Sequence, residues 1–203
     1  MTDSLPYLVS LFIGIGLAAA TGFRVFLPIF FLSLGTYLKI IPLDADYAWI
    51  GSLPAVIATG IATLTEIIAY YIPFVDNILD SITVPLATIA GSMLFASQFT
   101  EVNNWIQWSL AIIAGGGTAA TISSVLAGTR AASSTTTAGV GNPVLSTVET
   151  IGSTIMSIFA IFIPVLAGIL VLIMLYFAIK YGKKLYYKIS GKKQQNKFKD
   201  STC

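Results

Sequence analysis

The sequence predicts an all-α fold, a polytopic transmembrane helical bundle of about six membrane segments that could include broken or re-entrant helices. Hydrophobic residues make up 56% of the 203 residues, charged residues make up 10%, and the mean hydropathy is +0.85. Soluble domains average roughly 45–50% apolar and 25% charged residues, and several apolar runs here are long enough to cross a bilayer. We therefore expect residues 1–180 to form one transmembrane domain and residues 181–203 to form a basic cytoplasmic tail.

The first half of the chain contains three apolar segments. Residues 5–21 predict a first helix, and residues 23–38 predict a second, short one with Arg24 at its start. A polar connection over residues 39–47 separates them from a spanning helix over residues 50–72, which ends before a proline.

The second half begins with residues 74–83, whose two aspartates fall on one face and whose apolar residues fall on the other. This pattern predicts an amphipathic piece at the membrane interface, followed by a short apolar segment over residues 84–99. Residues 105–127 predict a long helix with a flexible glycine run near its middle. Residues 150–179 predict the last spanning helix, with a kink at Pro164.

Residues 128–147 are rich in Ser, Thr, Gly and Asn, although they lie between two strongly apolar segments. They could form an external loop. They could equally form a re-entrant or partly unwound stretch, since irregular backbone at membrane depth is tolerated where protein or water satisfies its polar groups. The composition leaves both alternatives open.

Basic residues are concentrated at the C-terminus, where eight of the eleven lie between Lys180 and Lys199. Because cytoplasmic segments carry an excess of Lys and Arg, we expect a cytoplasmic C-terminus, with a bacterial cytoplasmic membrane as the location and an organelle membrane as the alternative. The expected partners are the lipid bilayer and, at the tail, anionic lipid headgroups. Small residues on several helices permit a homo-oligomer.

The residues that are absent exclude much chemistry. The chain has no histidine, and Cys203 is the only cysteine, so zinc sites of the Cys/His type, cysteine nucleophiles and Ser-His-Asp triads are excluded. Asp76 and Asp80 could hold a divalent metal, but two carboxylates on one helix face are more often simply solvated. We expect no enzyme, cofactor, metal site or nucleic-acid partner.

Four charged residues lie inside or beside membrane-length apolar segments, namely Arg24, Glu66, Arg130 and Glu149. A charge at mid-membrane costs roughly 2.5–3.5 kcal/mol on insertion scales, so such residues usually face a bundle interior and pair with one another. Glu149 is the expected partner of Arg130. Each arginine ends a Gly-x-Arg tripeptide, which would fit a duplication of the kind that places broken helices around a central site.

A polar stripe runs along the predicted helix over residues 50–72. Thr59, Thr63, Glu66 and Tyr70 are spaced i, i+4, i+7 and i+11 on an otherwise apolar helix. In one interpretation Glu66 is a proton or cation site. In the other, Glu66 pairs with Arg24 to fix helix packing, and each threonine bonds to its own helix backbone.

The order and spacing of three groups of residues resemble an integral membrane family of unknown activity, known as domain of unknown function 4126. The groups are Gly22-Phe23-Arg24 with Phe26 and Pro28; Glu66 with Pro73, Asp76 and Asp80; and Gly128-Thr129-Arg130 with Asn142, Ser146 and Glu149. The resemblance covers roughly residues 8–175. The chain has Tyr70-Tyr71 where the family pattern has an Asp-Lys pair, and Thr150 where it has an acidic residue.

Two classes of function fit these residues. The chain could be a small transporter or channel for an ion or small solute, or a structural or accessory membrane protein whose buried charge pairs specify packing. Translocation of an anionic lipid is a third alternative, because paired arginines suit phosphate. The predicted substrate or ion pathway consists of Arg24, Thr59, Thr63, Glu66, Asp76, Asp80, Arg130, Asn142, Ser146 and Glu149.

Overall fold

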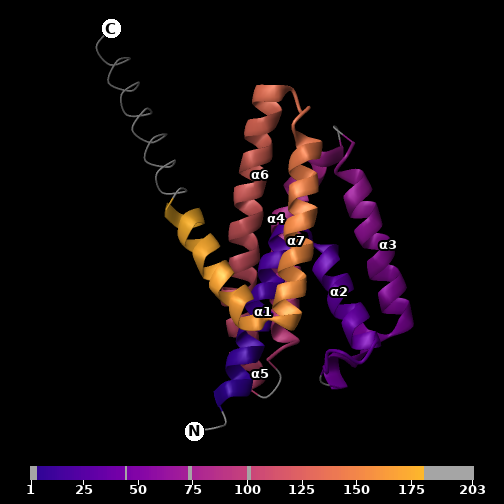
Figure 1. Cartoon of the computed structure of the whole chain (residues 1–203), viewed down its shortest axis with the longest axis vertical. Helices are drawn as coiled ribbons and strands as arrows, with labels where there is room; N and C mark the ends of the chain where they lie inside the picture. The colour runs from indigo at the N-terminus through magenta and orange to yellow at the C-terminus, as the bar shows by residue number, and fades with distance from the viewer. Residues whose placement is uncertain (1–3, 44, 73–74, 100–101, 181–203) are drawn as a thin grey trace.

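The computed structural model describes residues 4–43, 45–72, 75–99 and 102–180, and these residues form helices joined by short turns. The predicted tail over residues 181–203 lies outside the described residues. The elements in chain order are α1 (Ser4–Phe23), α2 (Phe26–Tyr37), the 3₁₀ helix η1 (Ala45–Gly51), α3 (Leu53–Ala69), α4 (Val75–Ala96), α5 (Asn104–Leu110), the π-helical η2 (Ala111–Gly116), α6 (Gly117–Thr137) and α7 (Asn142–Phe162), followed by the helix Pro164–Lys180 (Figure 1).

Three stretches of the described chain are long and apolar enough to cross a bilayer: Ile78–Ala96, Asn104–Thr137 and Asn142–Phe162. Four shorter apolar helices accompany them: Tyr7–Phe23, Phe26–Tyr37, Leu53–Ala69 and Pro164–Lys180. The prediction of a helical membrane bundle is therefore confirmed. The count of six membrane segments stays a prediction.

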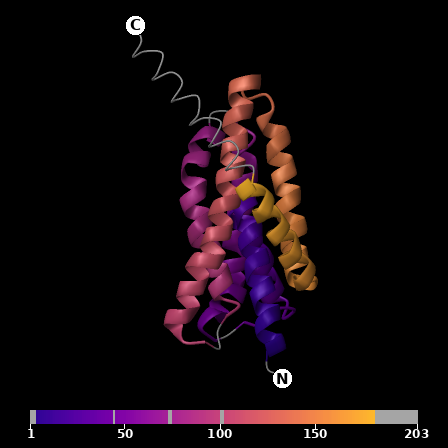
Figure 2. The same cartoon turned by 90° about the vertical axis from the view of Figure 1, so that its left-hand side faces the viewer.

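Helix α1 lies at the centre of the bundle, packed against α4, α6 and α7 (Figure 2). Its run Leu17–Ala20 is fully buried, because three alanines let neighbouring helices approach closely. Helices α2 and α3 pack against each other at the edge of the bundle (Figure 1). The bundle thus consists of a tightly packed core and a peripheral pair of helices.

The predicted separation of residues 74–83 from residues 84–99 is wrong, because α4 runs without interruption from Val75 to Ala96 with Pro85 inside it. Proline is tolerated within membrane helices where neighbouring groups satisfy the freed backbone. The aspartates of the amphipathic start of α4 do not lie on an exposed face as predicted, whereas its Ile78 and Ile82 are exposed. Its aspartates instead find buried partners on α6 and α7.

Residues 128–147 form neither an irregular loop nor an unwound stretch, and a re-entrant position in the membrane stays a prediction. Helix α6 continues to Thr137 and α7 begins at Asn142, so the turn is only four residues long and includes Gly139 with a φ of 85°. The threonines of the last turn of α6 bond to carbonyl groups of their own helix, as Thr137 does to Ser133 at 2.8 Å. These internal hydrogen bonds allow a Ser/Thr-rich sequence to remain helical.

The predicted single helix over residues 150–179 is two helices. Helix α7 ends at Phe162, and the chain reverses at Ile163 so that the helix Pro164–Lys180 runs back along the bundle (Figures 1 and 2). A proline suits a first helical turn, where its missing N–H has no intrahelical partner to lose. Pro164 therefore begins a new helix rather than kinking an existing one.

The glycines of η2 permit close packing against α4. A Cβ added to Gly115 would lie 2.7 Å from the Gly91 carbonyl oxygen and 2.6 Å from the Phe95 Cβ, whereas one added to Gly117 would meet nothing within 4 Å. We expect Gly115→Ala to lower the free energy of unfolding by about 1–3 kcal/mol through overpacking. The control Gly117→Ala should be neutral or stabilising by about 0.5–1 kcal/mol. Thermal unfolding in detergent checks both, and equal stability of the two variants would contradict the close packing.

Candidate functional site

Arg24 lies where α1 ends and α2 begins, inside the bundle, and its side chain is fully buried. Its Nε donates to the Thr150 hydroxyl at 3.1 Å, and its Nη2 donates to both the backbone carbonyl (2.9 Å) and the hydroxyl of Ser146. The same Nη2 lies 3.8 Å from Oε2 of Glu149. A break between two helices thus places one guanidinium group against the first turns of α7.

Arg130 forms the second centre of positive charge. Its Nε donates to Glu149 Oε1 at 3.0 Å and its Nη2 pairs with Glu149 Oε2, so the carboxylate is held by two nitrogens of one fork. Its Nη1 donates to Asp80 Oδ1 at 3.2 Å. The predicted pairing of Arg130 with Glu149 is confirmed. Arg130 lies seven residues before the end of α6, about 10 Å below the α6–α7 turn at 1.5 Å per residue.

Tyr70 connects the two arginines. The Cζ atom of Arg24 lies 4.1 Å from the centre of the Tyr70 ring, and that of Arg130 lies 3.9 Å from it. The Tyr70 hydroxyl makes a 2.5 Å hydrogen bond with that of Thr83 on α4. Cation–π attraction offsets part of the repulsion between two guanidinium groups. Tyr70 belongs to the polar stripe predicted from the sequence but not to the predicted pathway, and its position one helical turn after Glu66 was the signal that could have identified it.

Glu66 caps helix α2 from the neighbouring helix α3. Its Oε1 accepts from the backbone N–H of Val25 at 2.8 Å, and its Oε2 accepts from that of Phe26 at 3.0 Å. A carboxylate is favoured there because helix N-termini carry unpaired N–H groups and partial positive charge. The predicted ion pair of Glu66 with Arg24 is wrong, since among the described residues the carboxylate within ion-pair distance of Arg24 is Glu149.

Among the described residues, the two threonines of the stripe make no hydrogen bond to the arginines. Thr59 donates to the Ala55 carbonyl at 2.7 Å, and Thr63 donates to the Thr59 carbonyl at 2.8 Å. They make the bonds to their own helix that the packing interpretation predicted.

Asp76 and Asp80 lie inside the protein rather than on the predicted interfacial surface. Asp76 is 1% exposed, and its Oδ2 accepts from the Asn142 amide at 2.7 Å. Asn142 also donates to Ser134 at 2.9 Å. Asp80 contacts Arg130, and its side chain remains 18% exposed. The Asp80 carboxyl group is therefore partly accessible from outside the protein.

We call these residues the charge cluster: Arg24, Glu66, Tyr70, Asp76, Asp80, Arg130, Asn142, Ser146, Glu149 and Thr150. The cluster contains two guanidinium groups and four carboxyl groups, so its formal charge with every group ionised is 2 − 4 = −2. The α2 N-terminus offsets part of this charge at Glu66. Chemically, such a cluster favours a proton or a small cation over an anion. Within the described part of the chain, no group of three or more His, Cys, Asp or Glu residues could hold a metal ion.

A cavity of about 270 Å³ adjoins the charge cluster between α3 and α4, with Glu66, Tyr70 and Thr83 in its wall. A second, much smaller space of about 10 Å³ is lined by Asp80, Arg130, Glu149 and Ser123. The latter is about the size that one water molecule needs. The Ser123 hydroxyl is buried and has no hydrogen-bond partner among the described residues, which fits a water molecule at this position.

Removing the Tyr70 ring should weaken the charge cluster. We expect Tyr70→Leu to lower the free energy of unfolding by about 2–3 kcal/mol, because two guanidinium groups lose their aromatic partner and Thr83 loses a hydrogen bond. Tyr70→Phe keeps the ring and should lose only about 0.5–1.5 kcal/mol. Thermal unfolding of purified protein measures both. Equal losses in the two variants would show that the ring contributes nothing beyond its hydroxyl.

Comparison with known proteins places the chain in a family. No curated protein and no solved structure matches the chain. A family model, described as domain of unknown function (DUF4126), matches residues 11–184, which include the whole charge cluster. The chain therefore belongs to the DUF4126 family of proteins of unknown function.

Proposed function

We propose that this protein is a small integral membrane transporter or channel for an ion or small solute, and that the charge cluster is its site. The observation that carries the proposal is the gathering of two arginines and four carboxyl groups inside the bundle, with Arg130 paired to Glu149 and Asp80, beside a cavity of about 270 Å³. Ionisable groups within membrane segments are rare and commonly mark ion or proton pathways. The proposal assigns the cluster no catalytic role.

The balance of charge supports a positively charged or proton-coupled cargo. Arg130 is shared between Glu149, which holds it by two nitrogens, and Asp80, which holds it by one at 3.2 Å. A proton or cation arriving at Asp80 would release Arg130 from α4 while Glu149 retains it. Asp80 is therefore the proposed entry carboxylate.

Helices α2 and α3 are the part of the protein that could move during transport. Transporters commonly bind cargo at discontinuous helices, and here the break between α1 and α2 lies at Arg24. Helix α3 packs on α2, and its C-terminal end is tied to the core by hydrogen bonds of Tyr70 to Thr83 (2.5 Å) and of Tyr71 to Thr147 (2.7 Å). We propose that α2 and α3 move together when these contacts break.

A structural or accessory role is the second candidate, and the burial of Arg24 favours it. The Arg24 side chain is fully buried and bonded to α7, and Glu66 is occupied by the α2 backbone. Such contacts specify packing without any cargo. Under either role, a bacterial cytoplasmic membrane with the C-terminus in the cytoplasm belongs to the proposal.

Water access to the cavity separates the two candidates. Cys203 is the only cysteine, so Cys203→Ser gives a background without thiols. In this background, Ala62→Cys places a thiol in the cavity wall. Ile61→Cys places one on the outer side of the same helix, where Ile61 is 60% exposed. In proteoliposomes, a transporter should react at Ala62→Cys with a membrane-impermeant thiol reagent, whereas the lipid-facing Ile61→Cys should not. An unreactive Ala62→Cys would favour the structural role.

A further inference from the structure

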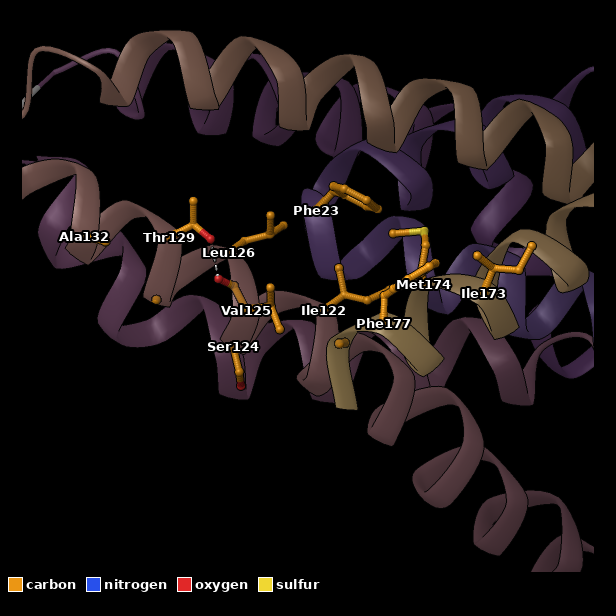
Figure 3. Close-up of a pocket in the computed structure, with 12 residues that line it drawn as sticks. Phe23, Ile122, Ser124, Val125, Leu126, Thr129, Ala132, Ile173, Met174 and Phe177 are labelled. Atoms are coloured by element: carbon orange, nitrogen blue, oxygen red, sulfur yellow. Dashed lines mark hydrogen bonds between the residues drawn. The ribbon is translucent and has the colours of Figure 1, made fainter. Parts of the chain in front are cut away.

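A large apolar groove lies between α6 and the helix Pro164–Lys180 (Figure 3), and two of its wall residues, Phe23 and Leu126, also line the small space beside Arg130 and Glu149. Its volume is about 780 Å³. The wall is formed chiefly by Phe23, Ile122, Val125, Ile173, Met174 and Phe177. The hydroxyl of Thr129 in the wall donates to the Val125 carbonyl at 2.9 Å, so this polar group is satisfied within its own helix. The groove is therefore suited to an apolar occupant.

The groove follows from the packing of the last helix and from small residues on α6. Near its start the last helix packs closely on α1, where Gly168 lies against Phe12 and Ala167 against Gly16. Further along it slants relative to α6 rather than running parallel to it (Figures 1 and 2). On the α6 side the wall includes Gly128, at which an added Cβ would meet nothing within 4 Å. The space is thus left open by the sequence rather than filled by side chains.

We propose that this groove binds one acyl chain of an anionic membrane lipid. The α6 wall extends from Ile122 to Ala132, which is about 15 Å at 1.5 Å per residue. One leaflet of a bilayer has the same thickness, about half of the roughly 30 Å hydrocarbon core. A single acyl chain therefore matches the groove in length and in polarity.

Positive charge at one end of the groove selects the headgroup. Ala178 lines the groove, and the exposed Lys180 lies two residues further along the same helix, with its amine 5.5 Å from the centre of the Tyr176 ring. Basic residues near a membrane surface attract anionic lipids by about 1 kcal/mol each. The occupant is therefore a lipid with a phosphate and a net negative charge.

Photocrosslinking of the full chain tests the proposal. The protein is reconstituted in vesicles of phosphatidylcholine and phosphatidylglycerol that contain a trace of phosphatidylglycerol with a diazirine on its acyl chain, and crosslinked peptides are mapped by mass spectrometry. We expect labels on residues 122–132 and 173–178, competed by added phosphatidylglycerol more strongly than by phosphatidylcholine. Gly128→Leu fills the groove and should reduce this labelling about tenfold, because its side chain displaces acyl methylenes.

Gly117→Leu is the matched control, because Gly117 lies on the same helix, also has open space around it and does not line the groove. It should be labelled like the wild type. If Gly128→Leu does not fold, Ala132→Leu, also in the groove wall, replaces it. Equal labelling of the filled-groove variant and the wild type would overturn the proposal, as would equal competition by the two lipids. In a separate Cys203→Ser, Ala132→Cys protein, disulfide crosslinks between two copies at this groove would overturn it in favour of a second copy.

Discussion

Replacement of Arg130 by methionine is expected to lower the free energy of unfolding by about 3–5 kcal/mol, the typical loss when one partner of a buried ion pair is removed. Methionine preserves an apolar stem but leaves Glu149, whose side chain is 4% exposed, without its two-nitrogen partner, and frees Asp80 as well. A loss of this size equals much of the stability of a typical domain. We expect little monodisperse protein on size-exclusion chromatography and a clearly lower melting temperature for the fraction recovered.

A double-mutant cycle distinguishes the lost pair from a general packing defect. Arg130→Met combined with Glu149→Gln removes both charges, so its destabilisation should be smaller than the sum of the two single changes, with a coupling within about 0.5–3 kcal/mol. Arg130→Lys should be intermediate, because it keeps the charge but loses the fork. Additive effects, or an Arg130→Met protein as stable as the wild type, would contradict the ion pair.

Replacement of Glu66 by leucine is expected to destabilise the protein by about 3–6 kcal/mol, because hydrogen bonds to charged groups contribute about 1.5–3 kcal/mol each and two are lost. The N–H groups of Val25 and Phe26 would remain at the α2 N-terminus without their acceptor. Glu66→Gln retains one acceptor oxygen and should lose about half as much. Thermal unfolding in detergent should give the order wild type, Glu66→Gln, Glu66→Leu.

Thr65→Val is the control for this series, since Thr65 lies beside Glu66, is exposed and donates its hydroxyl to the Ile61 carbonyl of its own helix. Its thermal stability should equal that of the wild type.

Exchanging the charges of Arg24 and Glu66 is a second test of the contacts of Glu66. Because Glu66 binds backbone rather than Arg24, the exchanged protein should not recover stability. Recovery would mean that the two side chains form a direct ion pair.

Composition and charge placement were enough to predict the class of fold and part of the charge cluster. Apolar runs of spanning length are a strong signal, and a charge in such a run must find a partner, which is why Arg130 and Glu149 could be paired from the sequence. The partner of Glu66 could not be predicted, because backbone N–H groups carry no mark in the sequence. A helix N-terminus exposes such donors only once the position of the helix end is known.

The errors in the fold came from residues whose behaviour depends on their neighbours. Ser and Thr have modest helix propensity, so the sequence predicted either a loop or a re-entrant or partly unwound stretch. Hydroxyls that bond to their own helix instead allow α6 to reach Thr137. Two prolines also have roles that were not predicted. Pro85 lies inside a continuous helix, and Pro164, predicted to kink a helix, begins a new helix after a reversal. A proline marks a missing N–H, but tertiary packing decides whether the chain bends, turns back or continues.

Charge movement in proteoliposomes on a solid-supported membrane tests the central claim most directly. The wild type, Asp80→Asn and the control Asp46→Asn, an exposed aspartate of η1, are given pH jumps and then a panel of monovalent cations. Asp80→Asn should stay folded, because Arg130 keeps its two contacts with Glu149. We predict a current in the wild type and in Asp46→Asn that is lost in Asp80→Asn. Silence of folded wild-type protein across the panel, or an unchanged current in Asp80→Asn, would contradict an ion pathway through the charge cluster.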